Sequence, residues 1–116
     1  MLKLAIVGCG WAGSRHIEAV RELGEKIEVV CLVDNDEAFV NEKAAEFGID
    51  KVYTDYADAL KDTDIDAVDI CTPHHLHCTQ AVAAAEAGKH VLVEKPMART
   101  VKEASRMMAA ADQNGI

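Results

Sequence analysis

Apolar and polar residues follow two different periodicities along this chain. Short, almost uniformly apolar runs are typical of strands that a parallel sheet buries on both faces. We predict strands for five such segments, at residues 2–7, 27–33, 52–53, 66–71 and 90–93. The segments between them place apolar residues at helical spacing. We predict helices there, at residues 11–23, 36–47, 55–60, 74–87 and 100–113.

The helix boundaries carry local signals. Asp55 and Thr100 are expected N-caps, and Glu103 stands at the capping-box position behind Thr100. Three helices are followed by a glycine, which favours the left-handed conformation at a helix end. These residues are Gly24, Gly48 and Gly88. The face that the first helix is predicted to turn inward consists of Ala12, His16, Ala19, Val20 and Leu23.

Strands that alternate with helices along the whole chain predict an α/β fold. The expected architecture is a Rossmann-type doubly wound parallel sheet with right-handed crossovers and helices on both faces. With 116 residues and no linker or internal repeat, residues 1–116 are expected to form a single domain. The chain ends after a helix, so we expect the sheet to be truncated before its sixth strand.

Composition narrows the range of partners. Half of the residues are hydrophobic and 28% are charged, which is ordinary for a globular protein. The net charge of -8 argues against binding to nucleic acid or to an anionic membrane surface. No signal peptide or membrane-spanning run is visible. The four cysteines form no C-x-x-C pair and lie in or beside apolar segments, which predicts reduced, buried thiols in a cytoplasmic protein.

The first candidate site is GCGWAG, a G-x-G-x-x-G loop between the first predicted strand and the first predicted helix. In this context Gly8 allows a tight turn, Gly10 lets the backbone approach a pyrophosphate, and Gly13 lets the helix pack closely on the strand. The free N–H groups at the start of the helix then face the phosphates. The loop therefore predicts a dinucleotide-binding site rather than a purely structural turn.

Asp34 stands about twenty residues beyond the loop, at the end of the second predicted strand. A carboxylate there accepts hydrogen bonds from the adenosine ribose and repels a 2′-phosphate. No arginine follows closely, and Lys43 is the nearest downstream cation, so NAD is favoured over NADP. Alternatively, Asp34 or Asp36 caps the second helix, and each acid can hold one of the two roles.

A further group of candidates follows the fourth predicted strand, at the edge where ligands bind in open α/β sheets. Thr72 and Pro73 are expected to form rigid backbone beside the cofactor. His74, His77 and Cys78 share one face of the next helix and invite comparison with a metal site. Zinc ligands usually come from a preformed shell rather than from one helix start, so we predict no native metal.

Glu94 and Lys95 end the fifth predicted strand at the same edge, before Pro96. A lysine there points toward the nicotinamide end of a bound dinucleotide. It is a candidate for hydrogen bonding to a ribose or substrate hydroxyl and for proton transfer. The alternative is a surface lysine before a turn-forming proline, and position alone leaves both interpretations open.

Three segments together, GCGWAGSRH, the TP-x-x-x-H run and AGKHVLVEKPMA, resemble the glucose–fructose oxidoreductase, inositol dehydrogenase and MocA (Gfo/Idh/MocA) family of NAD(P)-dependent oxidoreductases. The resemblance covers essentially all of the chain, in order. It implies an N-terminal Rossmann domain that is followed in the family by a C-terminal substrate domain, which we expect to be absent from this chain. It also implies hydride transfer at the nicotinamide, mostly on hydroxyl or carbonyl groups of sugars and cyclitols.

The resemblance implies a role for each matching residue. The residues that it places against the pyrophosphate are Gly8, Gly10, Trp11, Ala12 and Gly13. Asp34 is implied to hold the adenosine ribose. The residues implied to line the nicotinamide side are Thr72, Pro73 and His77. Glu94 and Lys95 are implied to approach the nicotinamide ribose, and Lys95 is the implied catalytic residue in contact with substrate.

Two departures from the family pattern bear on function. His74 stands where the family often has asparagine, which affects a loop hydrogen bond. The family's other proton-transfer residues lie on the C-terminal domain, so we expect little or no turnover from this chain alone. The favoured interpretation is the cofactor-binding domain of a sugar or cyclitol dehydrogenase. The alternative is a non-catalytic NAD(P)-binding sensor or regulatory module. Apolar surface at the sheet edge and last helix further predicts a homo-oligomer.

Overall fold

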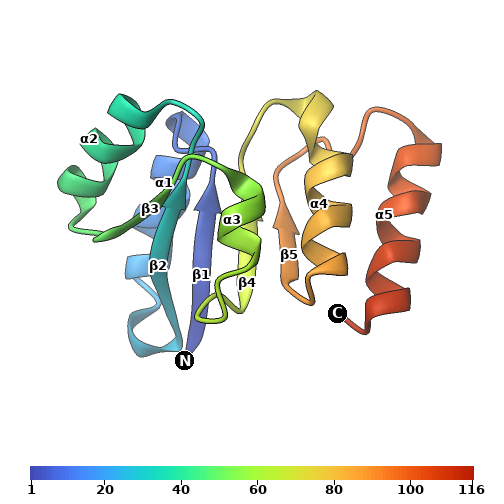
Figure 1. Ribbon diagram of the computed structural model, residues 1–116, viewed down its shortest axis with the longest axis horizontal. Helices are drawn as coiled ribbons and strands as arrows, with labels where there is room; N and C mark the ends of the chain where they lie inside the picture. Colours follow the sequence, from blue (N-terminus) through green and yellow to red (C-terminus); the bar gives the residue numbers. More distant parts are fainter.

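The computed structural model describes residues 1–116 and contains one parallel sheet with helices on both of its faces (Figure 1). The strands are β1 (Leu2–Val7), β2 (Ile27–Val33), β3 (Lys51–Tyr53), β4 (Ala67–Ile70) and β5 (His90–Val93). Their order in the sheet is β3-β2-β1-β4-β5, and every neighbouring pair is parallel. This is the strand order of the predicted Rossmann-type fold, which is thereby confirmed.

Helices cover the sheet in two layers. They are α1 (Trp11–Arg21), α2 (Glu37–Phe47), α3 (Tyr56–Leu60), α4 (His77–Glu86) and α5 (Val101–Asn114), with short 3₁₀ turns η1 (Gly24–Lys26) and η2 (His74–Leu76). Helices α1 and α2 pack on one face, and α3, α4 and α5 on the other. None of the helices combines the length and the hydropathy that crossing a bilayer requires.

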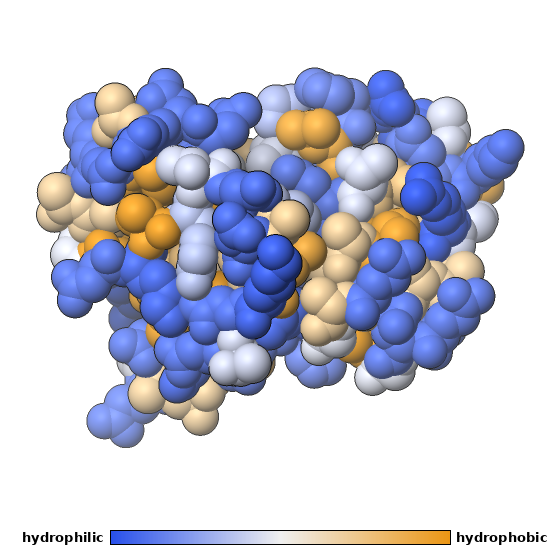
Figure 2. All heavy atoms as spheres, viewed as in Figure 1, coloured by the Kyte–Doolittle hydropathy of each residue, from blue (hydrophilic) through white to orange (hydrophobic).

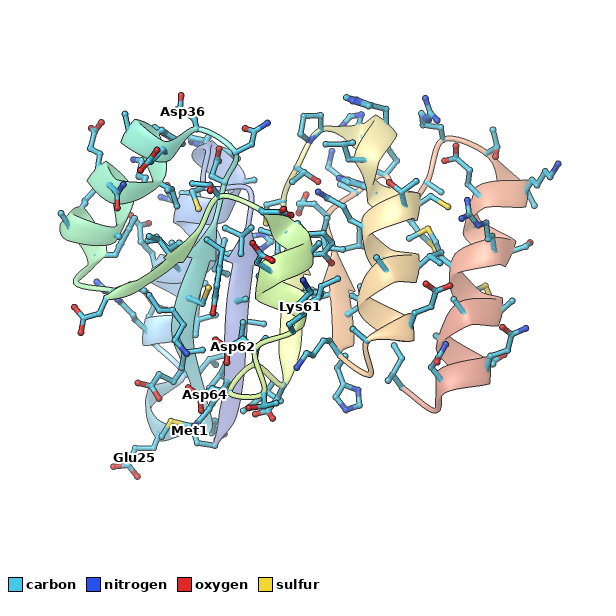
Figure 3. The ribbon with its side chains drawn as sticks, in the orientation of Figure 1. Met1, Glu25, Asp36, Lys61, Asp62 and Asp64 are labelled. Carbon is cyan, nitrogen blue, oxygen red and sulfur yellow. The ribbon has the colours of Figure 1, made fainter.

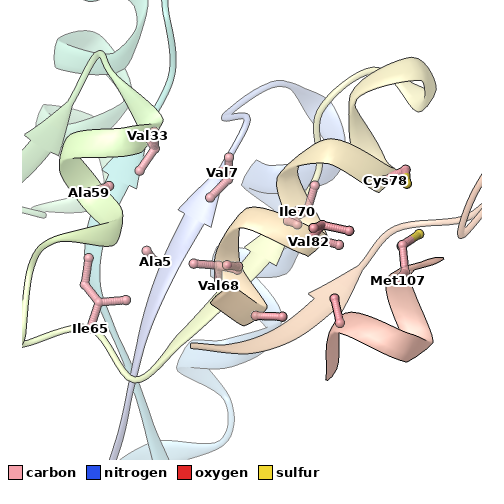
Figure 4. Packing of buried hydrophobic residues seen from close by; sticks show 14 of the residues in the cluster. Ala5, Val7, Val33, Ala59, Ile65, Val68, Ile70, Cys78, Val82 and Met107 are labelled. Atoms are coloured by element: carbon pink, nitrogen blue, oxygen red, sulfur yellow. The ribbon is translucent and has the colours of Figure 1, made fainter. Parts of the chain in front are cut away.

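Strand β1 shows why the sheet is covered on both sides. Its side chains alternate, so that Leu4 and Ile6 join the core under α1 and α2 while Ala5 and Val7 join the core under the other three helices. Figure 4 shows this second core, in which Val82 of α4 and other apolar side chains meet the central strands. The outer surface is mostly hydrophilic in the view of Figure 2, with small separate hydrophobic areas.

The structure corrects the predicted face of the first helix. Helix α1 ends at Arg21, and its fully buried side chain is Ile17, whereas Ala19 and Leu23 of the predicted face are exposed. The helix is rotated because Gly13 packs directly on the end of β1, which turns the residue one helical turn later toward the sheet.

The segment expected to form one helix from residue 74 is divided. His74–Leu76 form the 3₁₀ turn η2, closed by the N–H of Leu76 on the carbonyl of Pro73 at 3.0 Å, and α4 begins only at His77. The other predicted caps hold. Asp55 and Thr100 accept hydrogen bonds from the N–H groups of Ala57 and Glu103 at 2.9 and 3.0 Å.

Candidate functional site

A cavity of about 900 Å³ opens at the carboxyl ends of β1, β2 and β4. This is the edge at which the strand order reverses and where α/β sheets bind their ligands. Of the residues implied to bind a cofactor, those that line the cavity are Gly8, Gly10, Asp34, Thr72 and Pro73. The cavity also has walls that the sequence analysis did not identify, formed by Asn35, Asp36, Phe39, Thr54, Asp55, Tyr56, His75, Leu76 and Gln80.

Two glycines of the loop are required by the fold. Gly8 has a φ of +88°, and a β-carbon there would lie 2.9 Å from the backbone of Cys71 and Thr72. A β-carbon on Gly13 would lie 2.1 Å from the carbonyl oxygen of Gly8. The tight turn and the close approach of helix to strand predicted for these two positions are therefore both present.

Gly10 differs from them, because nothing lies within 4 Å of the position its β-carbon would take. It is the N-cap of α1, where no side chain caps the helix and no acidic residue lies in the first turn. The N–H groups at the start of α1 are thus without helical partners and available to an anion. Trp11 is 82% exposed beside this turn.

Asp34 is held across the glycine loop by the backbone. One carboxylate oxygen accepts a hydrogen bond from the N–H of Cys9, and the other accepts one from the N–H of Asp36, both at 3.1 Å. Asp36 itself caps α2 by accepting a hydrogen bond from the N–H of Phe39 at 3.0 Å. Figure 3 shows Asp36 at the end of the molecule where the loops gather. Asp36 is therefore the cap of α2, and Asp34 lines the cavity, where its expected role at the adenosine ribose stays a prediction.

His77 lies behind the cavity rather than in its lining. Its ring is fully buried, and its nitrogens Nε2 and Nδ1 contact the carbonyl oxygens of Thr72 and Pro96, each at 2.8 Å. It joins the Thr72–Pro73 segment to the turn after β5, and its implied role on the nicotinamide side stays a prediction.

His74, His77 and Cys78 do not bring their ligand atoms together as a metal site would. The two ring nitrogens of His77 are both engaged, and the thiol of Cys78 donates to the carbonyl of Glu103 at 3.6 Å. His74 is exposed, and its ring centre is 5.7 Å from that of His77.

Glu94 and Lys95 follow β5 at the same edge of the sheet but outside the cavity lining. The Glu94 N–H donates to the carbonyl of Ile70 at 2.9 Å and so continues the strand pairing with β4. Lys95 is exposed, and its ammonium group has no hydrogen-bond or ion-pair partner in the chain. Trp11, Ala12 and Gly13 likewise lie beside the cavity without lining it.

A polar cluster beside the glycine loop was not predicted from the sequence. Asp69 of β4, only 1% exposed, lies 2.7 Å from Nδ1 of His16 on α1, and the Cys71 thiol is 3.4 Å from the same nitrogen. A charged residue inside the buried strand AVDI was the available signal, because such a residue needs a partner.

These three side chains also offer ligand atoms within 4.8 Å of one another. However, bonds of about 2.0–2.1 Å to tetrahedral zinc keep ligand atoms about 3.3 Å apart. The 2.7 Å contact between His16 and Asp69 is shorter and has the length of a hydrogen bond. The arrangement thus favours a hydrogen-bonded pair over a metal site.

Comparison with known proteins agrees with this geometry. The family described as an oxidoreductase family with an NAD-binding Rossmann fold, Gfo/Idh/MocA, matches residues 2–116. Inositol 2-dehydrogenase of Salmonella typhimurium is 35% identical over 98% of this chain and 34% of its own length. The 4-carboxy-2-hydroxymuconate-6-semialdehyde dehydrogenase of a Sphingobium species is 33% identical over 99% of this chain and 36% of its own.

Solved structures show the same likeness. The WlbA dehydrogenase from Bordetella pertussis, crystallised in complex with NADH and UDP-GlcNAcA, superposes with a TM-score of 0.93 at 33% identity. The match covers 98% of this chain and 35% of that one, so the chain spans about a third of the length of the relatives it matches. The chain therefore belongs to the Gfo/Idh/MocA oxidoreductase family, of which it forms the NAD-binding Rossmann domain.

Proposed function

We propose that the cavity holds the dinucleotide with its pyrophosphate over the turn at Gly10 and its adenosine ribose at Asp34. The observation that carries this proposal is the convergence of two opposite features on one cavity. The start of α1 offers unpartnered N–H donors, and Asp34 offers a carboxylate held by two backbone N–H groups. Donors there match phosphate oxygens, and a carboxylate matches ribose hydroxyls.

We propose further that the nicotinamide end lies toward Thr72, Pro73 and the turn at Glu94 and Lys95. The bound cofactor supplies the hydride acceptor or donor. The chain's own contribution is to orient that end and to bring the Lys95 ammonium group to a substrate hydroxyl. Lys95 suits this role because no group of the chain neutralises its charge. It then holds or transfers the hydroxyl proton during oxidation or carbonyl reduction.

We propose sugars, cyclitols or related hydroxyl and carbonyl compounds as the substrate class of the whole protein. Relatives with names such as inositol 2-dehydrogenase, levoglucosan dehydrogenase and D-apiose dehydrogenase support this class. Those relatives are about three times as long as this chain. We therefore propose that the remaining substrate-binding and proton-transfer groups lie outside these 116 residues, and that this domain alone has little or no turnover.

Two further properties belong to this proposal. The cysteines are free and three of them are buried, which suits a reducing, cytoplasmic compartment. The open edge of the sheet at β5 leaves apolar side chains exposed, which suits association with a second copy.

Calorimetric titration of this chain with NADH, and separately with NADPH, tests the cofactor site. Saturable binding of NADH with much weaker binding of NADPH is the expected result. Tighter binding of NADPH contradicts the role of Asp34, and binding of neither contradicts the proposed site as a whole.

A further inference from the structure

Asp69 is the most deeply buried carboxylate of the chain and lies on the face of the sheet that α1 covers. Its side chain comes from the middle of β4, where it is 1% exposed among apolar neighbours. One oxygen is 2.7 Å from Nδ1 of His16, and the other accepts a weak hydrogen bond from the Cys71 thiol at 3.5 Å. A carboxylate so buried anchors its partner firmly, because breaking the contact leaves a buried charge unpaired.

The other side of the His16 ring faces a second carboxylate. Nε2 lies 3.5 Å from one oxygen of Glu94, whose other oxygen accepts a hydrogen bond from the N–H of Lys95 at 3.2 Å. Carboxylates only accept hydrogen bonds, so the Nδ1 side of the ring faces the acceptor Asp69 while the Nε2 side faces the acceptor Glu94. The imidazole therefore links the helix that starts at the glycine loop, a buried strand and the turn at Glu94 and Lys95.

The Cys71 thiol is the third titratable group in contact with this ring, at 3.4 Å from Nδ1. Burial raises the pKa of the Cys71 thiol, which therefore stays neutral beside the two carboxylates. No other side chain forms a hydrogen bond or an ion pair with the Glu94 carboxylate. Without His16, this partly exposed side chain would sample several rotamers, and ligand binding would have to order it.

We infer that His16 is a positioning residue: anchored by Asp69, it holds Glu94 and the adjoining Lys95 in the orientation that receives the nicotinamide half of the dinucleotide. This inference rests on the proposed function, because it presumes that the nicotinamide half lies at this turn. The inference goes beyond the proposed function because it assigns a role to His16, which lines no part of the cavity and acts through Glu94.

The test compares two ligands on this chain, NADH and ADP, because ADP shares the adenosine and pyrophosphate but lacks the nicotinamide half. The variant His16→Asn keeps a donor near Asp69 but is too short to reach Glu94. We expect it to weaken NADH binding about tenfold and to change ADP binding less than about twofold. His90→Asn is the matched control and should change neither affinity, because His90 is exposed at the amino end of β5, away from the carboxyl ends of the strands where the cavity lies.

A second comparison shows whether His16 acts through Glu94. Glu94→Gln, on a partly exposed side chain, should reproduce the selective loss for NADH even if His16→Asn proves unstable in thermal unfolding. The double variant should bind NADH no more weakly than Glu94→Gln alone, because the two changes remove one linkage.

Other outcomes overturn the inference. Equal losses for NADH and ADP mean that His16 only supports the fold of α1, and unchanged NADH binding means that it orients nothing. Additive losses in the double variant mean that the two residues act separately. If the unmodified chain binds neither NADH nor ADP, the proposed function fails as well. If the unmodified chain binds both ligands but His16→Asn does not weaken NADH binding more than ADP binding, this inference alone is overturned.

Discussion

The carbonyl oxygen of Gly8 lies where Gly13 can have no side chain, since a β-carbon on Gly13 would be 2.1 Å from it. This contact brings the first turn of α1 directly onto the end of β1. Gly10, three residues before Gly13, meets no atom of the chain within 4 Å. Gly13 is thus required by the fold, whereas the space beside Gly10 is empty and lies on the side from which a ligand approaches.

This difference predicts opposite effects of two equivalent substitutions. Gly13→Ala should lower the free energy of unfolding by about 2–3 kcal/mol, because α1 must move away from β1. Gly10→Ala should cost only about 0.5–1 kcal/mol at the N-cap. It should nevertheless weaken NADH binding at least about tenfold, because its methyl group occupies the approach of the pyrophosphate. Thermal unfolding and calorimetry of both variants measure these effects, and equal destabilisation by the two would contradict the assignment.

Asp34 is predicted to decide between the two nicotinamide cofactors. Replacing it with alanine removes the acceptor for ribose hydroxyls and the charge that repels a 2′-phosphate. Asp34→Ala should weaken NADH binding about tenfold and bring the NADH and NADPH affinities closer together. The matched control is Asp36→Asn, which also removes one negative charge but keeps the side-chain oxygen that caps α2. If the preference for NADH survives Asp34→Ala but is lost in Asp36→Asn, then Asp36 and not Asp34 discriminates between the two cofactors, and the prediction is wrong.

Asp62 makes a stability contribution that depends on pH. Its contacts with the Lys51 ammonium group at 2.8 Å and the N–H of Asp64 lower its pKa from 3.8 to about 2. Figure 3 shows Asp62 and Asp64 at the end of the molecule away from Asp36, so the cofactor site is not disturbed. Because the folded-state pKa is the lower one, the contribution is complete above about pH 4 and is lost as the pH falls toward 2.

The variant Asp62→Asn tests this dependence. It should lower the free energy of unfolding at pH 7 by roughly 1–2 kcal/mol, and the difference from the unmodified chain should shrink between about pH 4 and pH 2. Asp58→Asn is the control, because Asp58 pairs only with Lys61 on the open surface at 3.3 Å. Urea unfolding at several pH values measures both. A difference for Asp62→Asn that is constant down to pH 2 would contradict the shifted pKa.

The open edge of the sheet predicts concentration-dependent association. Leu92 on β5 is 57% exposed, and Met108 on α5 is 61% exposed and lines an apolar cavity of about 290 Å³ together with Val91, Val93 and Ile116. Burial of such surface favours contact between copies of the chain. Light scattering should report a mass that rises with protein concentration.

A charged substitution on this surface should reduce the association. The double variant Leu92→Lys and Met108→Lys should stay monomeric at concentrations where the unmodified chain associates. Leu23→Lys, on the exposed turn after α1, is the control and should leave the association unchanged. A monomer at high concentration of the unmodified chain is the result that rules this prediction out.

Local patterns determined most of the fold. The apolar run before GCGWAG predicted β1, and the glycine spacing predicted a turn and helix whose close packing the structure contains. These features depend on residues a few positions apart, so the sequence displays them directly. The predicted helix start at residue 74 was wrong, because His74–Leu76 form a 3₁₀ turn before α4.

Tertiary structure alone decided the contacts between distant segments. The rotation of α1 could not be predicted, because the packing of Gly13 on Gly8 sets which residues of the helix turn toward the sheet. The packing of α1 on the sheet places His16 against Asp69, 53 positions away in sequence. The burial of His77 was likewise settled by carbonyl groups on two separate loops. The sequence by itself thus determined the fold class, the glycine loop and the position of Asp34 at the end of β2, because neighbouring residues specify these features. The partners of the buried polar side chains were decided only by the tertiary structure, because they come from distant segments that pack together.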